Sequence, residues 1–258
     1  MKFQEPNDAS GKPIALVTGG SRGIGAATAA LLAEQGYDLC ISYRAREADA
    51  HRIVEKCRAL GANAIAVQAD IAVEADVERL FREVDQQLGR LSALVNNAGM
   101  LLTQSRLEDM TAARINQILQ TNVTGTLLCC REAVRRMSTL HGGTGGAIVN
   151  VSSGAARSGS PYEYIDYAAS KGAVDTLTIG LSNEVAKEGI RVNGVRPGFI
   201  HTEMHADGGE PDRIARLATQ IPLGRGGKDT EVAAAIAWLL SEQAAYSTGT
   251  FIDVTGGC

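Results

Sequence analysis

Residues 14–25 read Ile14-Ala15-Leu16-Val17-Thr18-Gly19-Gly20-Ser21-Arg22-Gly23-Ile24-Gly25, which is a short apolar run followed by a turn rich in glycine. An Ala-rich stretch with helical periodicity follows, so the segment predicts a strand, a tight turn and a helix in succession. Glycine lets a backbone approach a diphosphate closely, and the free N–H groups and dipole at a helix start attract its charge. The glycine spacing is G-x-x-x-G-x-G rather than G-x-G-x-x-G, so a purely structural turn is the alternative. The candidate phosphate contacts are Gly19, Ser21, Arg22, Gly23, Ile24 and Gly25.

Short apolar runs alternate with helical segments along the whole chain. Strands are expected at 14–17, 39–43, 64–67, 91–95, 147–151, 190–195 and 251–254. Helices are expected at 24–35, 48–60, 73–88, 107–140, 167–187 and 230–241. Strands that are apolar on both faces need helices on both sides. We therefore expect an α/β fold, a single-domain Rossmann-type, doubly wound, seven-stranded parallel sheet flanked by helices.

Length and composition indicate one ordinary globular domain. The chain has 258 residues, 45% of them hydrophobic, and a net charge of −4. The acidic balance and the lack of a long apolar run predict no nucleic-acid partner and no membrane partner. Residues 1–12 are expected to be a polar tail without a targeting signal, 13–258 the functional domain, and 198–227 a substrate-binding loop or lid. The five cysteines form no C-x-x-C pair, which argues against a disulfide framework or a thiolate zinc site, and the cytoplasm is the expected location.

The end of the second strand indicates which dinucleotide would bind. A site selective for NAD commonly carries Asp or Glu there, because the carboxylate accepts hydrogen bonds from the ribose and repels a 2′-phosphate. Here the strand ends in Tyr43 and Arg44, with no acid. Arg44, and Arg22 from the glycine turn, would pair with the 2′-phosphate of NADP(H). The alternative is that both are solvated surface arginines.

Three tyrosines lie within residues 161–171, and only Tyr167 has a lysine four positions later, Lys171. Residues four apart share one face of a helix. A nearby ammonium favours the phenolate, so the sequence predicts a lowered pKa for Tyr167, which would make it usable as an acid or base. Taken alone, the pair also fits a surface lysine beside an amphipathic tyrosine.

The polar motifs recur in a fixed order at the carboxyl ends of predicted strands, where ligands bind in open α/β sheets. After the glycine turn come Asn96-Asn97-Ala98-Gly99, Ser152-Ser153, Tyr167-x-x-x-Lys171 and Pro197-Gly198. Together they resemble the short-chain dehydrogenase/reductase family over residues 13–257, which implies NADP(H)-dependent hydride transfer and a homotetramer.

The resemblance also implies roles for individual residues. Tyr167 would be the acid/base, Ser153 would hold the carbonyl oxygen, and Lys171 would bind the nicotinamide ribose and tune Tyr167. Asn122, in the run Leu119-Gln120-Thr121-Asn122-Val123, would complete a water-linked proton relay. The remaining cofactor contacts would be Asp70 and Ile71 at the adenine, Asn96, Ala98 and Gly99 at the adenosine side, and Pro197, Gly198, Ile200 and Thr202 at the carboxamide.

One departure from the family is the interval from Ser153 to Tyr167, which is 167 − 153 = 14 and longer than usual, so this loop carries an insertion. His201 and His205 are four apart but lie in a loop and do not form His-Glu-x-x-His, so no metal is expected. The adjacent pair Cys129-Cys130 is expected to be packed in a helix, because neighbouring residues there point in different directions.

Two enzyme functions and one non-enzymatic function remain open on the sequence. The first is reduction of a small polar carbonyl compound, or oxidation of the alcohol, and its substrate is not identified. The second is reduction of 3-oxoacyl chains on acyl carrier protein, whose acidic surface needs basic partners such as Arg131, Arg135 and Arg136. The resemblance argues against it, because Glu188 stands where the family's carrier-dependent reductases tend to carry a basic residue. The third is a non-catalytic NADP(H) sensor or scaffold, which the retained Tyr167 and Lys171 make less favoured.

Overall fold

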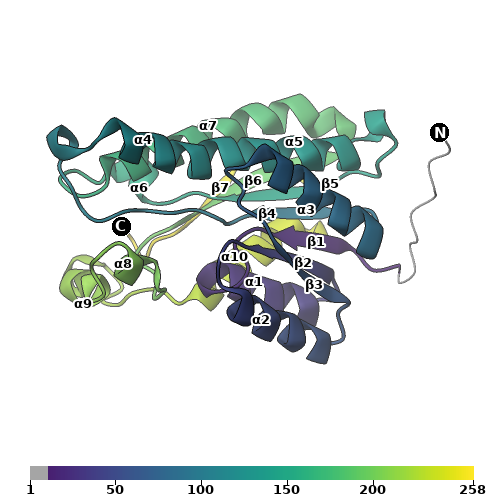
Figure 1. Ribbon diagram of the computed structural model, residues 1–258, viewed down its shortest axis with the longest axis horizontal. Helices are drawn as coiled ribbons and strands as arrows, with labels where there is room; N and C mark the ends of the chain where they lie inside the picture. Colours follow the sequence, from purple (N-terminus) through teal and green to yellow (C-terminus); the bar gives the residue numbers. More distant parts are fainter. Residues whose placement is uncertain (1–10) are drawn as a thin grey trace.

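The computed structural model describes residues 11–258, so most of the predicted 1–12 tail lies outside the described part. Seven parallel strands form one sheet in the order β3-β2-β1-β4-β5-β6-β7, which confirms the predicted single-domain, doubly wound fold (Figure 1). The strands are β1 Ile14–Val17, β2 Asp38–Tyr43, β3 Ala64–Gln68, β4 Ala93–Asn96, β5 Gly146–Val151, β6 Ile190–Pro197 and β7 Phe251–Val254.

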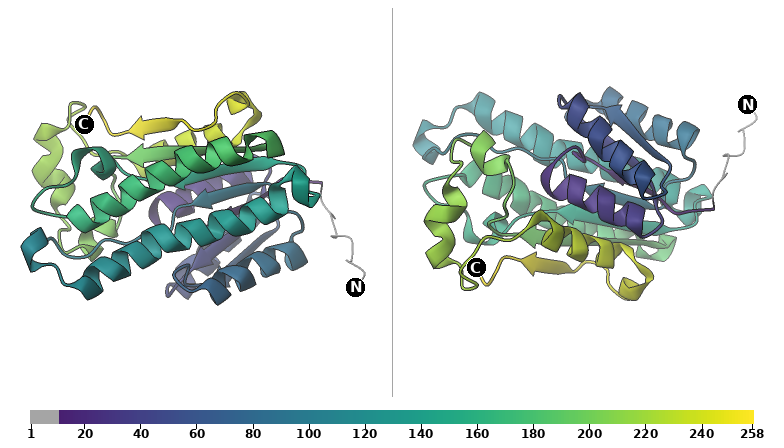
Figure 2. Two further views of the ribbon diagram at one scale, coloured as in Figure 1. Left: turned by 90° about the horizontal axis from the view of Figure 1, so that it is seen from above. Right: turned by 90° about the horizontal axis from the view of Figure 1, so that it is seen from below.

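Helices cover both faces of the sheet, as Figure 2 shows from opposite sides. One layer consists of α1 Gly23–Glu34, α2 Glu47–Ala59 and α10 Asp229–Leu240, and the other of α3 Glu74–Gln87, α5 Gly125–Met137 and α7 Ile165–Val185. Acidic residues in the first turns of α2, α3 and α10 offset the positive end of each helix dipole. The first turn of α1 has no acidic residue, so its positive end is left for a ligand. Within residues 11–258, no helix has the length and apolar character to cross a membrane.

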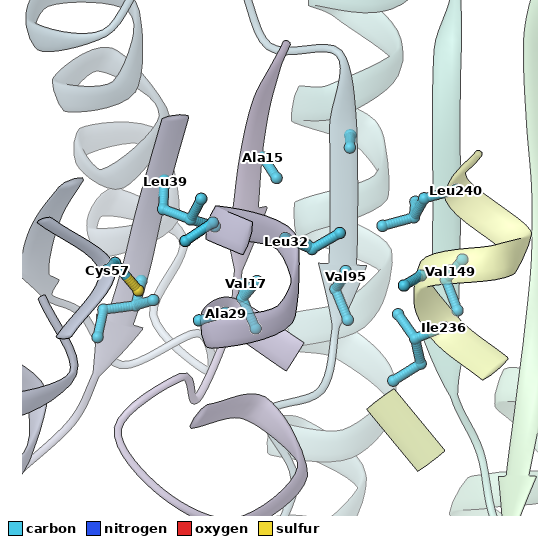
Figure 3. Packing of buried hydrophobic residues seen from close by; sticks show 14 of the residues in the cluster. Ala15, Val17, Ala29, Leu32, Leu39, Cys57, Val95, Val149, Ile236 and Leu240 are labelled. Atoms are coloured by element: carbon cyan, nitrogen blue, oxygen red, sulfur yellow. The ribbon is translucent and has the colours of Figure 1, made fainter. Parts of the chain in front are cut away.

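Strand alternation divides the core into two layers, one on each face of the sheet. In β1, Ala15 and Val17 face α1, α2 and α10, and Ile14 and Leu16 face α3, α5 and α7. Figure 3 shows the first layer, where Leu32 of α1 packs among strand residues of the sheet. Because both faces are covered, the ends of the strands are the places left for a site.

The chain reverses direction across the sheet at β1. From β1 it winds outward through β2 and β3, then crosses back to place β4 on the other side of β1. This switch point opens a crevice at the carboxyl ends of β1 and β4. The glycine turn leaves β1 at this crevice, and Asn97 follows β4 there.

The single helix predicted at 107–140 is wrong in its boundaries and its continuity. The chain forms a short 3₁₀ turn at Leu107–Asp109, then α4 Ala112–Leu119, a π-helical turn at Gln120–Thr124, and α5 up to Met137. Thr111 caps α4 by accepting a hydrogen bond from the Arg114 amide, which fixes the helix start. A π turn is a local widening of a helix by about one residue, and apolar periodicity alone does not reveal it.

The segment 198–227 is less irregular than the sequence predicted. It contains α8 Met204–Asp207 and α9 Arg213–Leu217, followed by a 3₁₀ turn at Ala218–Gln220. Both helices are too short to be stable alone. Arg213 in α9, which is 6% exposed, forms ion pairs with Glu163 and Glu210 and thereby holds the segment, which we call the lid, against the domain.

Candidate active site

Two neighbouring cavities lie at the carboxyl ends of the strands. The first, of about 510 Å³, is the glycine-turn cavity. The second, of about 480 Å³, is the tyrosine cavity, and Ile24, Asn97, Leu101, Thr202 and Met204 line both. The predicted site residues in the glycine-turn cavity are Gly19, Ser21, Arg22, Gly23, Ile24, Tyr43, Arg44, Asp70, Ile71, Ala98, Gly99 and Thr202. Those in the tyrosine cavity are Ile24, Ser153, Tyr167, Lys171, Pro197, Gly198, Ile200 and Thr202.

The glycine turn has the geometry of a cradle for a diphosphate. Gly19 and Gly23 have φ angles of +62° and +51°, which favour glycine. A Cβ atom at Gly19 would lie 3.0 Å from the Ala98 Cα atom, so a side chain there would crowd the floor of the cavity. The side chain of Arg22, the residue before α1, caps no helix amide, so the amides at the helix start remain available to an anion. These residues fit the diphosphate of a dinucleotide.

Gly25 serves packing rather than contact, since it lines neither cavity. A Cβ atom on it would lie 2.4 Å from the Gly19 carbonyl oxygen and 2.5 Å from Asn97 Nδ2. Asn97 Nδ2 donates to the carbonyls of Thr18 and Gly19 at 2.9 and 3.0 Å. The loop after β4, the glycine turn and the start of α1 are therefore packed tightly at Gly25.

Asn96 is a second predicted cofactor contact that lies outside both cavities. It is the last residue of β4, and its side chain lies between the sheet and α5, where it is 4% exposed and donates to Asn150 Oδ1 at 2.9 Å. It lines neither cavity, whereas Asn97 lines both. The alternation of side chains at a strand end is the signal that separates the two asparagines.

Arginines gather at the far side of the glycine-turn cavity. Arg22, Arg44 and Arg46 all line it, and Arg46 is a residue that the sequence analysis missed. The guanidinium of Arg44 makes no ion pair with any residue between 11 and 258 that the structure describes. Arg22, by contrast, forms ion pairs with Glu203 and Asp207 of the lid. Three cationic side chains here suit a phosphate group.

Tyr167, Ser153 and Lys171 meet in the tyrosine cavity. Tyr167 lies in the first turn of α7, and Lys171 follows one turn later with its Nζ atom 5.6 Å from the centroid of the Tyr167 ring. The Lys171 Nζ atom donates to the Val151 carbonyl oxygen at 2.8 Å, which fixes it at the end of β5. Ser153 follows the same strand, and its hydroxyl accepts from the Ala155 amide at 3.1 Å.

The predicted lowering of the Tyr167 pKa is wrong in this structure. Burial raises the pKa of Tyr167 to about 12, although a hydrogen bond with Ser153 acts in the opposite direction. Burial also lowers the pKa of Lys171 to about 8, opposed by the nearby charge of Asp175. Removal from water thus sets the direction of the shift and favours the neutral hydroxyl of Tyr167.

Asn122 lies in the π-helical turn and is fully buried. Its side chain accepts from the Met100 amide and donates to the Met100 carbonyl and to Ser170 Oγ, at 2.8, 2.9 and 3.0 Å. A Cβ atom on Gly99 would lie 3.4 Å from both Asn122 Oδ1 and Lys171 Nζ, so these residues converge at Gly99. Asn122 therefore ties the loop after β4 to α7, beside Lys171.

The long interval between Ser153 and Tyr167 holds the short helix α6, Ala155–Ser158, and a strained turn. Ser160 and Tyr162 have φ angles of 43° and 67°, the only positive values outside glycine in residues 11–258. Ser160 lines the tyrosine cavity. The insertion thus forms part of its wall.

Sequence reasoning also missed cavity residues that the lid and the loop before α7 supply. Tyr164, Phe199, His205 and Arg213 line the tyrosine cavity. The sequence predicted a substrate-binding loop at 198–227 but not which of its side chains would line the cavity, because their positions depend on how the lid folds back.

Comparison with known proteins gives consistent matches over nearly the whole chain. A family model described as enoyl-(acyl carrier protein) reductase matches residues 19–258. The uncharacterized oxidoreductase YgfF of Escherichia coli K12 is 60% identical over 244 residues, which cover 95% of this chain and 99% of that protein. The 3-oxoacyl-acyl-carrier-protein reductase FabG of Staphylococcus aureus Mu50 is 39% identical over 243 residues, 94% of this chain and 96% of that protein.

Solved structures agree with the fold. A short-chain type dehydrogenase/reductase from Mycobacterium marinum superposes with a TM-score of 0.88 at 31% identity, covering 95% of this chain and 94% of that chain. Acetoin dehydrogenase YohF from Salmonella typhimurium gives 0.83 at 34% identity, covering 95% and 96%.

Proposed function

This chain belongs to the short-chain dehydrogenase/reductase family, and on that premise we propose that it transfers a hydride between NADP(H) and the carbonyl or alcohol carbon of a small polar substrate. The observation that carries the proposal is the meeting of Tyr167, Ser153 and Lys171 in a cavity that adjoins the glycine-turn cavity. A cavity of about 480 Å³ suits a small molecule. The similar acetoin dehydrogenase acts, by its name, on a small hydroxyketone.

In the direction of carbonyl reduction, NADPH bound in the glycine-turn cavity would supply the hydride. Ser153 and Tyr167 hold the carbonyl oxygen by hydrogen bonds, and Tyr167 donates the proton to that oxygen. Its raised pKa, about 12, keeps this proton on the hydroxyl until the oxygen becomes basic. Lys171, fixed on Val151, would hold the nicotinamide ribose. Asn122 keeps the neighbouring loop in place, and the family resemblance assigns it a part in the water-linked proton relay.

The experiment that tests the proposal is a screen of small carbonyl compounds, hydroxyketones and polyols that follows NADPH absorbance. We expect turnover with small polar carbonyls and little with 3-oxoacyl carrier protein. Arg131, Arg135 and Arg136 are already paired with acidic residues of this chain, which reduces their attraction for an acidic carrier. Efficient, salt-sensitive turnover of the carrier-linked substrate would reverse this order. Absence of turnover with every compound, despite NADP(H) binding, would favour the sensor or scaffold.

The proposed cofactor preference predicts tighter binding of NADPH than of NADH. A charge-assisted hydrogen bond contributes about 1.5–3 kcal/mol, so one productive contact to the 2′-phosphate gives roughly a tenfold preference. Replacement of Arg44 by alanine is expected to remove most of this preference while NADH binding stays within about twofold. Dissociation constants from nicotinamide fluorescence check this. Equal affinities in the wild type would contradict the preference, and an unchanged preference in Arg44→Ala would place the phosphate contact on other residues.

The proposed assembly is a homotetramer. Apolar side chains are exposed on the helices that the family pairs across a two-fold axis, with Leu119, Leu127 and Ile179 37%, 46% and 49% exposed. Light scattering is expected to give about four times the chain mass of 27.1 kDa, and Leu127→Glu to give a smaller species. A monomeric, active wild type would contradict the assembly.

The cytoplasm is the proposed location. All five cysteines are unpaired in the structure, and four of them are buried. Reduced thiols of this kind are typical of proteins in a reducing compartment.

A further inference from the structure

The lid is held to the glycine turn by a cluster of four charged side chains, which we call the arginine–lid cluster: Arg22, Arg46, Glu203 and Asp207. Glu203 Oε2 lies 2.9 Å from Arg22 Nη1 and 3.1 Å from Arg46 Nη1. Asp207 pairs with the other terminal nitrogen of Arg22, and its second oxygen lies 4.0 Å from Arg46 Nη2. Both terminal nitrogens of Arg22 are thus used by carboxylates of the lid.

All four members of the cluster also line the glycine-turn cavity. A carboxylate and a phosphate bind a guanidinium through the same planar N–H donors, so one guanidinium edge cannot serve both at once. Arg22 is, with Arg44, one of the two arginines that we assign to the 2′-phosphate. The lid therefore fills, with its own anionic groups, the donors that this phosphate would use.

We propose that Glu203 and Asp207 compete with the 2′-phosphate of NADP(H) for Arg22 and Arg46, so that binding of the phosphate releases α8 from the glycine turn. This inference rests on the proposed NADP(H) function. It assigns to Arg46 a part in cofactor selection, and to the two lid carboxylates the opposing part.

The same helix forms part of the wall of the other cavity. Met204 and His205 of α8 line the tyrosine cavity, and in the sequence they lie between Glu203 and Asp207, the two carboxylates of the cluster. Release of α8 would therefore change the space in which the substrate binds. NADH, which has no 2′-phosphate, leaves the cluster intact.

The effect of the competition on NADPH affinity is expected to be small, because the four charged side chains are exposed to water. The four side chains are 35%, 47%, 56% and 42% exposed, for Arg22, Arg46, Glu203 and Asp207, and ion pairs open to water are weak and screened by salt. Loss of both carboxylates is therefore expected to tighten NADPH binding about five- to tenfold at low ionic strength. The gain is expected to shrink at high salt.

The experiment measures dissociation constants of NADPH and NADH by nicotinamide fluorescence for the wild type, Glu203→Gln, Asp207→Asn and the double variant. Asp212→Asn is the matched control, because Asp212 is an exposed acid of the same lid with no ion pair among the described residues. We expect the double variant to bind NADPH more tightly, with NADH within about twofold of the wild type and Asp212→Asn unchanged. Hydrogen exchange of residues 204–207 is expected to increase with NADPH but not with NADH.

Two results would overturn the inference while leaving the proposed function in place. Weaker binding of both cofactors by the double variant would mean that the cluster is a strap that closes over a bound dinucleotide. Unchanged NADPH binding, with a wild type that still prefers NADPH, would mean that carboxylates and phosphate do not compete. A wild type without NADPH preference, and Arg22→Ala with unchanged NADPH binding, would instead contradict the proposed cofactor itself.

Discussion

Replacing Tyr167 with phenylalanine is expected to lower kcat/KM for carbonyl reduction by about 10³-fold, which is the usual contribution of a positioned acid or base. The change removes only the hydroxyl, which is the proton donor in the proposed reaction. The ring still fills its place beside Lys171, so NADPH binding is expected to stay within about threefold of the wild type. Steady-state rates and nicotinamide fluorescence measure the two effects separately.

Tyr164→Phe is the matched control for this variant. Tyr164 is equally buried, lines the same cavity and immediately precedes α7. Among residues 11–258 its hydroxyl has no hydrogen-bond partner of good geometry, and the nearby Gln104 donates to Glu210. We expect Tyr164→Phe to keep its activity within a few fold of the wild type. An inactive Tyr164→Phe beside an active Tyr167→Phe would transfer the acid role to Tyr164.

Replacing Gly25 with alanine is expected to weaken NADPH binding by about 100-fold, which corresponds to the loss of one or two charge-assisted contacts at the diphosphate. The added Cβ atom would lie 2.4 Å from the Gly19 carbonyl oxygen, and the obstacle is backbone rather than a flexible side chain. The turn must therefore move away from the start of α1. Overpacking of this kind typically costs about 1–3 kcal/mol, so a lower melting temperature is also expected.

Gly180→Ala is the control for the effect of a new methyl group. Gly180 lies inside α7, and a Cβ atom there meets nothing within 4 Å. Alanine in a helix interior is expected to raise stability by about 0.5–1 kcal/mol, with unchanged cofactor affinity. Light scattering on this variant verifies that its assembly is unaltered. If Gly25→Ala bound NADPH as tightly as Gly180→Ala, the glycine turn would not form the diphosphate site.

The sheet was predictable from the sequence because each strand is a short apolar run that can be recognised by itself. β1 was predicted at its observed bounds, and β2, β3 and β6 to within one or two residues. The helical segment at 107–140 was not, because apolar periodicity does not reveal a π turn and the Thr111 cap that starts α4 was not recognised. The lid helices are held by tertiary ion pairs such as those of Arg213, and local sequence does not contain that information.

The candidate site was predictable where a residue is identified by its position in a motif. Tyr167, Lys171 and Ser153 meet in one cavity, as the motif order implies. Arg46 was missed because it lies beyond the strand, and it reaches the cavity only through the start of α2. The pKa of Tyr167 was predicted in the wrong direction because spacing reveals a neighbouring charge but not the depth of burial, and burial raises this pKa.

The pairing of β1 with β4 has a consequence for how the protein folds during its synthesis. The hydrogen bond from Asn97 to the Gly19 carbonyl joins positions 78 residues apart. At a synthesis rate of about 5–20 residues per second, the glycine turn waits roughly 4 to 16 seconds for the strand that completes it. Because such distant contacts form slowly, the first two βα units leave the ribosome with one side of β1 unpaired. A nascent chain that stops before β4 therefore exposes one edge of β1. A bound nucleotide would stabilise the domain only after β4 has paired with β1.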